Sequence, residues 1–462
     1  MTAKKPAPST ADLRTRLDAE FPALLDELGA LVAIPSISSL PQHQDDLARS
    51  AEHVRSRFEA AGLEARVLSE TTPEGVVGKP AILAHGPRIE GAPTVLLYAH
   101  HDVQPVGDTS TWSSDPFTAE IRGERIYGRG TSDDGAGIIV HLGALRLLGD
   151  DLPVNVVVFI EGEEEIGSPS FQTFLERHAE ELSADVIVVA DSDNWKVGEP
   201  AVTATLRGNC TFTVDLRVAD HAVHSGMFGG PLLDAVTCGA LLVASMYDED
   251  GNLSVDGLGG TDEADVVWPE DEYRQAAGVL DGVRLAGTGD LAARVWTKPA
   301  LTVIGWDSTS VADASNTLAA STRIRFSLRT VPGQDPAVSM AAVEAAMRER
   351  APWGCRLEFS QVDLGPAYQA DMDAPATHLL HEVLTEAWGV PSVNIGVGGS
   401  IPFISQFQQT FPGASVVVTG VEDPLTNAHS EDESQSVPDL RCAILAEALY
   451  LARLAEAAAG RD

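Results

Sequence analysis

Apolar positions in the first part of the chain follow two patterns that alternate. Residues 13–31 and 46–61 carry them at helical spacing, and the second of these segments ends before Gly62. Other apolar positions form short continuous runs, which are typical of strands buried on both faces of a sheet. These runs are residues 94–98, 154–160, 185–190 and 415–419.

Helical spacing returns between the runs, at residues 135–148 and 170–182. A chain that alternates strand and helix in this way builds an open, mostly parallel sheet with helices on both faces. We therefore predict an α/β fold for the first part of the chain.

The pattern changes from about residue 208. Residues 210–218 and 323–330 alternate apolar and polar positions, and residues 231–246 have helical spacing. Alternation of this kind favours an antiparallel sheet with one polar face. A helical pattern at residues 375–388, followed by the run at 415–419, then resumes the first arrangement.

A chain of 462 residues exceeds the usual size of a single domain. We predict one domain of residues 1–207 plus 365–462, interrupted by a smaller α+β domain at residues 208–364. Within this insertion, residues 247–290 are rich in Asp, Glu and Gly and are expected to form an exposed excursion.

His, Asp and Glu residues follow each of the four short apolar runs. Because the carboxyl ends of parallel strands lie along one edge of a sheet, these side chains are expected to converge there. Carboxylates in such proximity repel one another unless cations lie between them, and mixed His and carboxylate ligands suit zinc, cobalt or manganese. The residues are His100-His101-Asp102, Glu161-Gly162-Glu163-Glu164-Glu165, Asp191-Ser192-Asp193 and Asn427-Ala428-His429-Ser430.

Each of these signals has a simpler explanation when it is taken alone. A single His-x-Asp is usually a surface turn, and a run of three glutamates is usually a solvated face. The sequence Asp133-Asp134-Gly135 is more often a turn or a helix cap than a ligand. Four acidic or histidine-bearing strand ends in one chain are harder to assign to chance, so we predict a metal site at this edge.

Charge and cysteine content narrow the partners of the protein. The chain has 68 Asp and Glu against 31 Lys and Arg, a formal charge of −37, which would repel nucleic acid and anionic membranes. Its four cysteines form no Cys-x-x-Cys motif and are too sparse for a disulfide framework. The first ten residues lack the apolar stretch of a signal peptide. We expect a cytoplasmic protein with no nucleic-acid or membrane partner.

Several motifs, in the expected order from about residue 31 onward, resemble those of the carnosinase-like dipeptidases. These enzymes belong to the broader metallopeptidase family that includes acetylornithine deacetylase and succinyl-diaminopimelate desuccinylase. The resemblance implies that residues 1–207 plus 365–462 form a metal-binding catalytic domain and that residues 208–364 form an inserted lid and dimerisation domain. The matching motifs are Tyr98-Ala-His100-His-Asp102-Val-Gln-Pro105, Tyr127-Gly-Arg-Gly-Thr-Ser-Asp133-Asp134, Glu161-Gly-Glu-Glu164-Glu165-Ile-Gly-Ser168, His224-Ser-Gly-Met-Phe-Gly-Gly230, Gly398-Gly-Ser-Ile-Pro402 and Asn427-Ala-His429-Ser430.

The resemblance further implies two divalent cations in each subunit, with zinc expected and cobalt or manganese possible. His100 and Asp191 would bind one cation, and Glu165 and His429 the other. Asp133 would bridge the two, which lets them lie roughly 3.5–4 Å apart and share a water molecule. In this family the peptide bond after the bridging Asp is cis, and we expect the same here.

The catalytic groups follow from the same resemblance. Asp102 would hold the imidazole of His100 in its ligating tautomer. Glu164 would be the general base, taking a proton from the bridging water and later delivering it to the leaving amine. Glu164 and Glu165, rather than Glu163, are chosen by the family register.

The resemblance decides one choice between two aspartates and fails at one pair of residues. Asp191 is preferred to Asp193 because Pro200 follows nine residues later, where relatives have a proline. Relatives often carry Arg-Glu just before the Gly-Gly-Ser-Ile-Pro motif, whereas this chain has Gly396-Val397. The departure leaves recognition of the substrate's ends open more than it affects the chemistry.

Substrate contacts are implied for the inserted domain and the Gly-Gly-Ser motif. His224, Asn316 and Arg329 match lid residues that contact substrate, and Gly399 and Ser400 match the motif. In the dipeptidases a lid histidine reaches the partner subunit's active site and stabilises the oxyanion, so a homodimer is expected. Arg329 would pair with the substrate carboxylate. Without the family resemblance, a charged residue on the solvated face of a strand is nearly as good an explanation.

The sequence therefore predicts a hydrolase that cleaves dipeptides or short peptides with a free C-terminal carboxylate. An N-acyl amino acid deacylase would use the same metal chemistry and stays open, although the long lid motif at residues 224–230 favours the dipeptidase. A non-catalytic binding protein on this fold would be expected to lose ligands or the base. None of the expected metal or catalytic residues is lost here.

Overall fold

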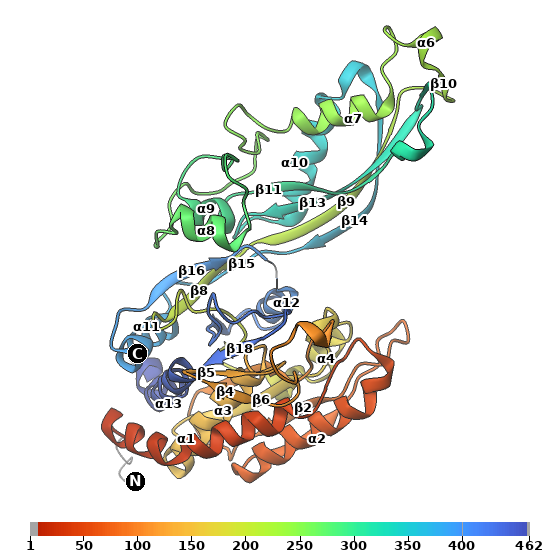
Figure 1. The fold of residues 1–462 in the computed structure, drawn as a ribbon. Coiled ribbons are helices and arrows are strands. Elements are labelled where there is room, and N and C mark those ends of the chain that lie inside the picture. Colours follow the sequence, from red (N-terminus) through yellow and green to blue (C-terminus); the bar gives the residue numbers. More distant parts are fainter. Residues whose placement is uncertain (1–7, 400, 460–462) are drawn as a thin grey trace. The chain divides into compact units, whose positions relative to one another are not determined.

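The computed structural model describes residues 8–399 and 401–459. They form two compact units (Figure 1). Unit 1 holds the described residues of Met1–Ala204, Ala370–Asn394 and Phe403–Asp462, and unit 2 holds those of Thr205–Gln369 and Ile395–Pro402. The unit boundaries fall at 204/205 and 369/370, whereas the sequence analysis placed the insertion at 208–364. The sequence analysis did not predict that residues 395–402 also belong to unit 2. No helix in these described ranges is long and apolar enough to cross a membrane.

Unit 1 is built on a six-stranded sheet with the strand order β1-β2-β6-β3-β7-β17. β3 pairs in parallel with β6 and β7, and β17 pairs in parallel with β7. β2 is antiparallel to both β1 and β6, an edge that the apolar runs did not predict. The strands are β1 (Glu64–Leu68), β2 (Ala81–His85), β3 (Thr94–His100), β6 (Asn155–Glu161), β7 (Val186–Val189) and β17 (Ser415–Val418).

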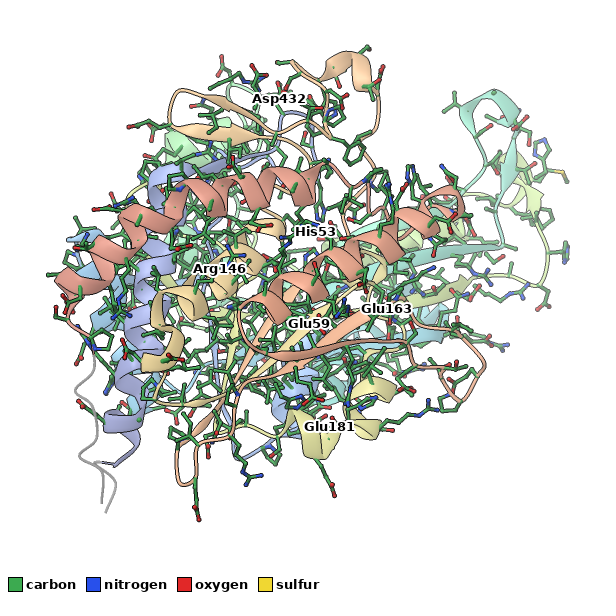
Figure 2. All side chains as sticks on the ribbon, turned by 90° about the horizontal axis from the view of Figure 1, so that it is seen from below. His53, Glu59, Arg146, Glu163, Glu181 and Asp432 are labelled. Carbon is green, nitrogen blue, oxygen red and sulfur yellow. The ribbon has the colours of Figure 1, made fainter. Side chains whose placement is uncertain are left out.

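One face of this sheet is covered by long helices. Because successive residues of a strand point to opposite faces, Val95, Leu97 and Ala99 of β3 all join the same apolar core. Glu27 pairs with Arg146 at 3.2 Å and lies 3.9 Å from His53, and these last two residues are labelled in Figure 2. The helices of this core are α1 (Thr10–Val32), α2 (Gln44–Ala60), α3 (Gly135–Leu148), α11 (Pro375–Trp388) and α13 (Val437–Ala459).

The opposite face is packed with aromatic rings. Tyr98 of β3 is fully buried there, and its ring centroid lies 4.3 Å from that of Phe403 and 5.5 Å from that of Phe407. The helices on this side are α4 (Phe171–Arg177), α5 (Ala179–Leu182) and α12 (Pro402–Thr410). Helices on both faces of a mostly parallel sheet confirm the predicted fold class. The single helix predicted at 170–182 is instead divided at His178 into α4 and α5.

Short strands and 3-10 helices complete unit 1 and the segments where the chain crosses from one unit to the other. β5 pairs with β4 and β18 in a small antiparallel sheet. The 3-10 helices are η1 (Pro41–His43), η2 (Thr109–Thr111), η3 (Gly149–Asp151) and η4 (Glu164–Ile166). The short strands are β4 (Glu120–Arg122), β5 (Arg125–Tyr127), β8 (Ala201–Leu206), β15 (Tyr368–Gln369), β16 (Val393–Val397) and β18 (Ser434–Ser436).

Unit 2 is an α+β structure with an antiparallel sheet in the order β11-β13-β9-β14. The apolar residues of β9 and β13 pack with α7 and α10 in a second core, and the alternate residues form a polar face. The predicted excursion at 247–290 is largely exposed and contains α8. The elements are β9 (Gly208–Arg217), β10 (Val223–His224), β11 (Ala300–Asp307), β12 (Thr317–Leu318), β13 (Ser321–Thr330), β14 (Arg356–Gly365), α6 (Ser225–Phe228), α7 (Ala235–Ala244), α8 (Glu270–Ala276), α9 (Leu291–Trp296), α10 (Pro336–Glu349), η5 (Val311–Asp313) and η6 (Pro352–Gly354).

Candidate active site

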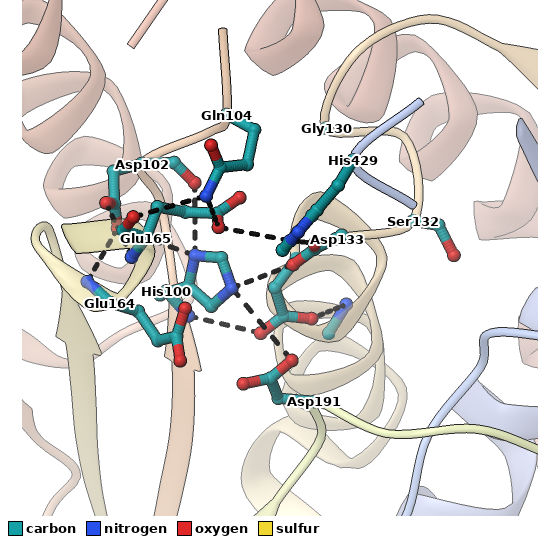
Figure 3. A network of polar contacts seen from close by, with 12 residues as sticks. His100, Asp102, Gln104, Gly130, Ser132, Asp133, Glu164, Glu165, Asp191 and His429 are labelled. Carbon is teal, nitrogen blue, oxygen red and sulfur yellow. Dashed lines mark hydrogen bonds and ion pairs between the residues drawn. The ribbon is translucent and has the colours of Figure 1, made fainter. Parts of the chain in front are cut away.

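The carboxyl-end edge of the unit 1 sheet gathers two groups of potential metal ligands. One group consists of His100, Asp133 and Asp191, and the other of Asp133, Glu165 and His429 (Figure 3). Within each group the ligand atoms all lie within 4.8 Å of one another. His100 ends β3, Asp191 follows β7, Glu165 lies in η4 after β6, and His429 lies in the loop after β17. The expected convergence of strand ends is therefore present in the fold.

Asp133 belongs to both groups because its two oxygens face different histidines. Its Oδ1 lies 3.0 Å from His100 Nε2, and its Oδ2 lies 2.9 Å from His429 Nε2. Asp191 Oδ1 lies 3.9 Å from His100 Nε2, and Glu165 Oε2 lies 3.2 Å from His429 Nε2. A carboxylate that presents one oxygen to each of two donor groups has the geometry of a bridge.

Asp134 joins the Asp133 loop to both α3 and β3. The peptide bond between Asp133 and Asp134 is cis, as the resemblance implied. Asp134 is the N-cap of α3, where its Oδ1 accepts a hydrogen bond from Gly137 N at 3.1 Å. Its Oδ2 accepts a second hydrogen bond, also of 3.1 Å, from His100 N. The end of strand β3 and the start of helix α3 are thus held by one carboxylate.

Glu433 holds the same loop from the other side. This fully buried carboxylate accepts hydrogen bonds from three backbone amides and from Arg129 Nη1, the last at 2.7 Å. Sequence reasoning missed Glu433 because it stands in the charged run Ser430-Glu-Asp-Glu-Ser434, which is typical of a solvated surface. The amides are those of Gly130 (2.9 Å), Ser132 (3.0 Å) and Asp133 (3.1 Å).

Asp102 orients two parts of the site. The Nδ1 atom of His100 lies 3.0 Å from the Asp102 carbonyl oxygen and 3.5 Å from its Oδ1, so the Nε2 atom faces the other ligands. The Asp102 carboxylate also accepts hydrogen bonds from the backbone amides of Glu164 (3.2 Å) and Glu165 (3.1 Å). The sequence predicted only the first of these contacts.

The three consecutive glutamates have different surroundings. Glu165 Oε2 accepts a hydrogen bond of 2.7 Å from Gln104 Nε2. Gln104 lies in the motif of residues 98–105, but the sequence did not predict this role for it. Glu163 (labelled in Figure 2) instead accepts hydrogen bonds from Lys79 N at 2.9 Å and from Ser170 N at 2.6 Å. Its carboxylate therefore stabilises loops and takes no part in the ligand groups.

Burial and crowding set the charges of the site. Burial raises the pKa of Glu164 to about 9 and that of Asp191 to about 7, and neighbouring carboxylates add to both shifts. Burial acts the same way on Asp133, but hydrogen bonds from His100 and His429 outweigh it and lower its pKa. Hydrogen bonds to Asp133 and Glu165 raise the pKa of His429 to about 10. The site thus favours added positive charge.

The donor set fits a pair of divalent cations. Two imidazoles and three carboxylates are available, of which Asp133 is shared, and this mixture suits zinc, cobalt or manganese. His100 is fully buried, whereas 57% of the His429 side chain is exposed. His429 is therefore the more solvent-accessible of the two histidines. Asp191, rather than Asp193, belongs to the described ligand groups.

The expected substrate residues belong to unit 2. His224 ends β10, and its Nδ1 accepts a hydrogen bond of 3.1 Å from Gly226 N at the start of α6. The carbonyl oxygen of Asn316 accepts a hydrogen bond of 2.9 Å from Ser225 N, so Asn316 and His224 lie together. Both side chains are exposed.

Arg329 and Gly399 lie elsewhere in unit 2. Arg329 is half-buried in β13, where it pairs with Asn209 of β9 and Ala300 of β11. Gly399 follows β16, and Ser400 lies outside the described residues. The structure thus brings His224 and Asn316 together near one end of β13 and places Arg329 near its other end.

Comparison with known proteins identifies the family of this site. The model of peptidase family M20/M25/M40 matches residues 96–453. The chain belongs to this family. It is therefore a metal-dependent peptidase, and the resemblance stated from its motifs is confirmed.

Two curated relatives and one solved structure show how far the similarity extends. The chain is 34% identical over 441 residues to a cysteinylglycine-S-conjugate dipeptidase of Corynebacterium striatum, covering 93% of this chain and 94% of the relative. It is 27% identical over 440 residues to a Beta-Ala-His dipeptidase of Rattus norvegicus, covering 90% and 88%. The crystal structure of human carnosine dipeptidase 1 has the same fold, with a TM-score of 0.72, 23% identity and coverage of 98% and 100%.

We predict that Glu433→Ala disrupts the ligand loop of this M20 peptidase. The substitution leaves Arg129 buried without its carboxylate, which costs about 3–5 kcal/mol in the free energy of unfolding of unit 1. Because the loop carries Asp133, metal affinity should fall roughly 10–100-fold. Denaturant unfolding and metal titration measure the two effects.

The matched control is Glu431→Ala, an exposed glutamate of the same loop. It should change the free energy of unfolding by no more than about 0.5 kcal/mol. Unchanged unfolding and metal affinity in Glu433→Ala would show that the loop is held by other contacts.

Proposed function

We propose that the protein hydrolyses dipeptides, or short peptides with a free C-terminal carboxylate, with two divalent cations. The observation that carries this proposal is Asp133, whose two oxygens face two separate His and carboxylate groups at one sheet edge. The names of the two curated relatives support a dipeptide as substrate. We also propose the cytoplasm as its location, in keeping with its four free cysteines.

In this proposal His100 and Asp191 bind one cation, Glu165 and His429 bind the other, and Asp133 bridges them. Zinc is the expected metal, with cobalt and manganese as alternatives of similar ligand preference. The bound cations would polarise the scissile carbonyl and lower the pKa of a water molecule held between them.

Glu164 is the proposed general base. Asp102 holds its backbone amide at 3.2 Å, while its own carboxylate has no hydrogen-bond partner among the described residues. With cations bound, which favour its ionised form, the carboxylate is available to take a proton from the attacking water and to deliver it to the leaving amine. Asp102 keeps Nδ1 of His100 engaged, so Nε2 stays free to act as a ligand.

Residues of unit 2 are proposed to recognise the substrate. Arg329 would bind the C-terminal carboxylate through its planar guanidinium group, with Asn316, Gly399 and Ser400 as further contacts. His224 is exposed, as a residue that acts on another subunit must be. We propose that the predicted inserted domain, residues 208–364, acts as lid and dimerisation domain in a homodimer.

Cleavage assays of the metal-loaded protein test the function. We expect hydrolysis of members of a dipeptide panel, complete loss after chelation, and recovery with zinc, cobalt or manganese. A parallel panel of N-acetyl amino acids should be poor substrates. Preferential cleavage of the acetylated panel would instead favour the deacylase. Full activity in protein shown by elemental analysis to be free of metal would refute the two-cation mechanism.

Two neighbouring substitutions separate base from ligand. Glu164→Gln should keep the bound metal but lose several orders of magnitude in kcat, because the amide cannot accept the proton. Glu165→Gln should weaken metal binding, because it removes an anionic ligand. Metal titration together with single-turnover kinetics distinguishes these effects. Exchanged phenotypes would mean that the assignment is displaced by one residue.

Recognition of the C-terminus is tested by amidation. Amidating a good dipeptide substrate should lower kcat/KM at least about tenfold, or roughly 1.4 kcal/mol, because a charge-assisted pair with Arg329 is lost. Arg329→Ala should erase most of this difference, while Arg323→Ala, which removes an exposed arginine of the same strand, should leave it intact. Equal cleavage of free and amidated peptides by the native enzyme would rule out the carboxylate contact.

The dimer proposal predicts complementation. His224→Ala and Glu164→Gln should each be nearly inactive, but a mixed dimer would hold one site with both groups intact. Activity should therefore reappear when the two variants are unfolded together and refolded, but not when each is refolded alone. A fully active monomer in solution would contradict the role of His224.

A further inference from the structure

Arg207 and Arg329 of unit 2 have no negatively charged partner among the described residues. Arg323 pairs with Asp215 at 3.0 Å on the polar face of the sheet. Arg325, on the same face, donates hydrogen bonds to Thr211 at 2.7 Å and to Thr213 at 3.0 Å. The guanidinium group of Arg329 makes no hydrogen bond or ion pair with any residue in the described part of the chain. This difference within one strand points to Arg329 as an unsatisfied cation.

Arg207 is the second of these arginines. It immediately precedes β9, two residues before Asn209, which faces Arg329 in the β9–β13 register. Its Nε donates to the carbonyl oxygen of Gly398 and its Nη1 to that of Lys298, each at 3.2 Å. Both acceptors are neutral, and Nη2 has no acceptor among the residues that the structure describes. Only 9% of the Arg207 surface is exposed.

The pair is costly without a counter-ion. A buried charge loses its hydration, and carbonyl oxygens replace only part of it. Burial, and then the nearby charge of Arg329, lowers the pKa of Arg207 to about 10. Burial likewise lowers the pKa of Arg329. The chain has 68 acidic residues, yet no carboxylate among the described residues is paired with either arginine.

Gly398 packs closely against Arg207. Gly398 is its hydrogen-bonded neighbour, and a Cβ atom at this position would lie 3.1 Å from Arg207 Nη2 and 3.0 Å from Val295 Cγ1. Any side chain at 398 would crowd the guanidinium group. Glycine therefore leaves the unused nitrogen of Arg207 uncovered by this residue.

We propose that Arg207 and Arg329 together form a dicarboxylate-binding site. Resting on the proposed function, Arg329 binds the C-terminal carboxylate and Arg207 binds a second carboxylate on the side chain of the same residue. One carboxylate would leave one of the two cations uncompensated, whereas two carboxylates balance both. The favoured substrates are therefore dipeptides whose C-terminal residue is Asp or Glu.

Isosteric substrates test this specificity. The metal-loaded native enzyme should cleave Ala-Glu at least about tenfold better than Ala-Gln, measured as kcat/KM, because only Ala-Glu offers the second charge. Arg207→Gln should bring Ala-Glu down to the level of Ala-Gln while leaving Ala-Gln within about threefold of its native value. Arg207→Lys should retain part of the preference. Arg325→Gln, which removes the same charge from the same sheet face, should leave the preference unchanged.

A binding measurement separates this inference from the proposed function. Calorimetric titration of the metal-loaded protein should show tighter binding of L-glutamate than of L-glutamine, and Arg207→Gln should abolish the difference. If this binding difference were found but no peptide were cleaved, the dicarboxylate site would be supported and the proposed peptide substrates would be refuted. Equal cleavage of Ala-Glu and Ala-Gln by the native enzyme would overturn the site. The site would also be overturned if Arg207→Gln lowered kcat/KM equally for both peptides and lowered the unfolding midpoint. Arg207 would then only hold Gly398 and Lys298 in place.

Discussion

The crowding of carboxylates around Asp133 is the constraint on which unit 1 depends. Asp133, Glu165 and Asp191 are withdrawn from water at one sheet edge, with Glu164 beside them. Such charges cannot remain together without protons or cations. A peptidase can use this instability, because a site that needs positive charge will hold divalent cations firmly where the scissile carbonyl has to be polarised.

The surrounding structure keeps these groups from relaxing apart. Asp102, Asp134 and Glu433 each direct carboxylate oxygens at backbone amides, so the loops that carry the ligands are fixed by charge-assisted hydrogen bonds. Glu433 also neutralises Arg129 in the interior. The positions of the candidate ligands are thereby set by the fold.

Unit 2 shows the opposite electrostatic problem. On the polar face of its sheet, Arg323 and Arg325 have acceptors, while Arg329 has none among the described residues and Arg207 has only carbonyl oxygens. In a chain of net charge −37, unpaired arginines are conspicuous. A chain of this net charge repels carboxylate ligands. Arginines that the protein itself does not neutralise can attract such ligands locally.

Much of the fold could be predicted because it depends on local pattern. The continuous apolar runs correspond to β3, β6, β7 and β17, since strands buried on both faces need apolar residues at every position. β1 was missed because it is short and only partly buried, and the helix predicted at 170–182 is interrupted where His178 contacts Glu70 at 2.9 Å. Contacts between residues about a hundred positions apart leave no periodic signal.

By itself, the sequence determined the α/β class, the family and the motifs of the candidate ligands, because strand ends, glycine positions and acidic runs are recorded in adjacent residues. Only the tertiary structure decided which carboxylates bind amides and which face the metal groups. Glu163 and Glu164 are neighbours in sequence, yet one stabilises loops and the other stands free beside the ligands. Glu433 and Arg207 acquire their importance from partners roughly 300 and 190 residues away. The desolvation and pairing of a charge depend on what folds around it, and composition cannot supply that.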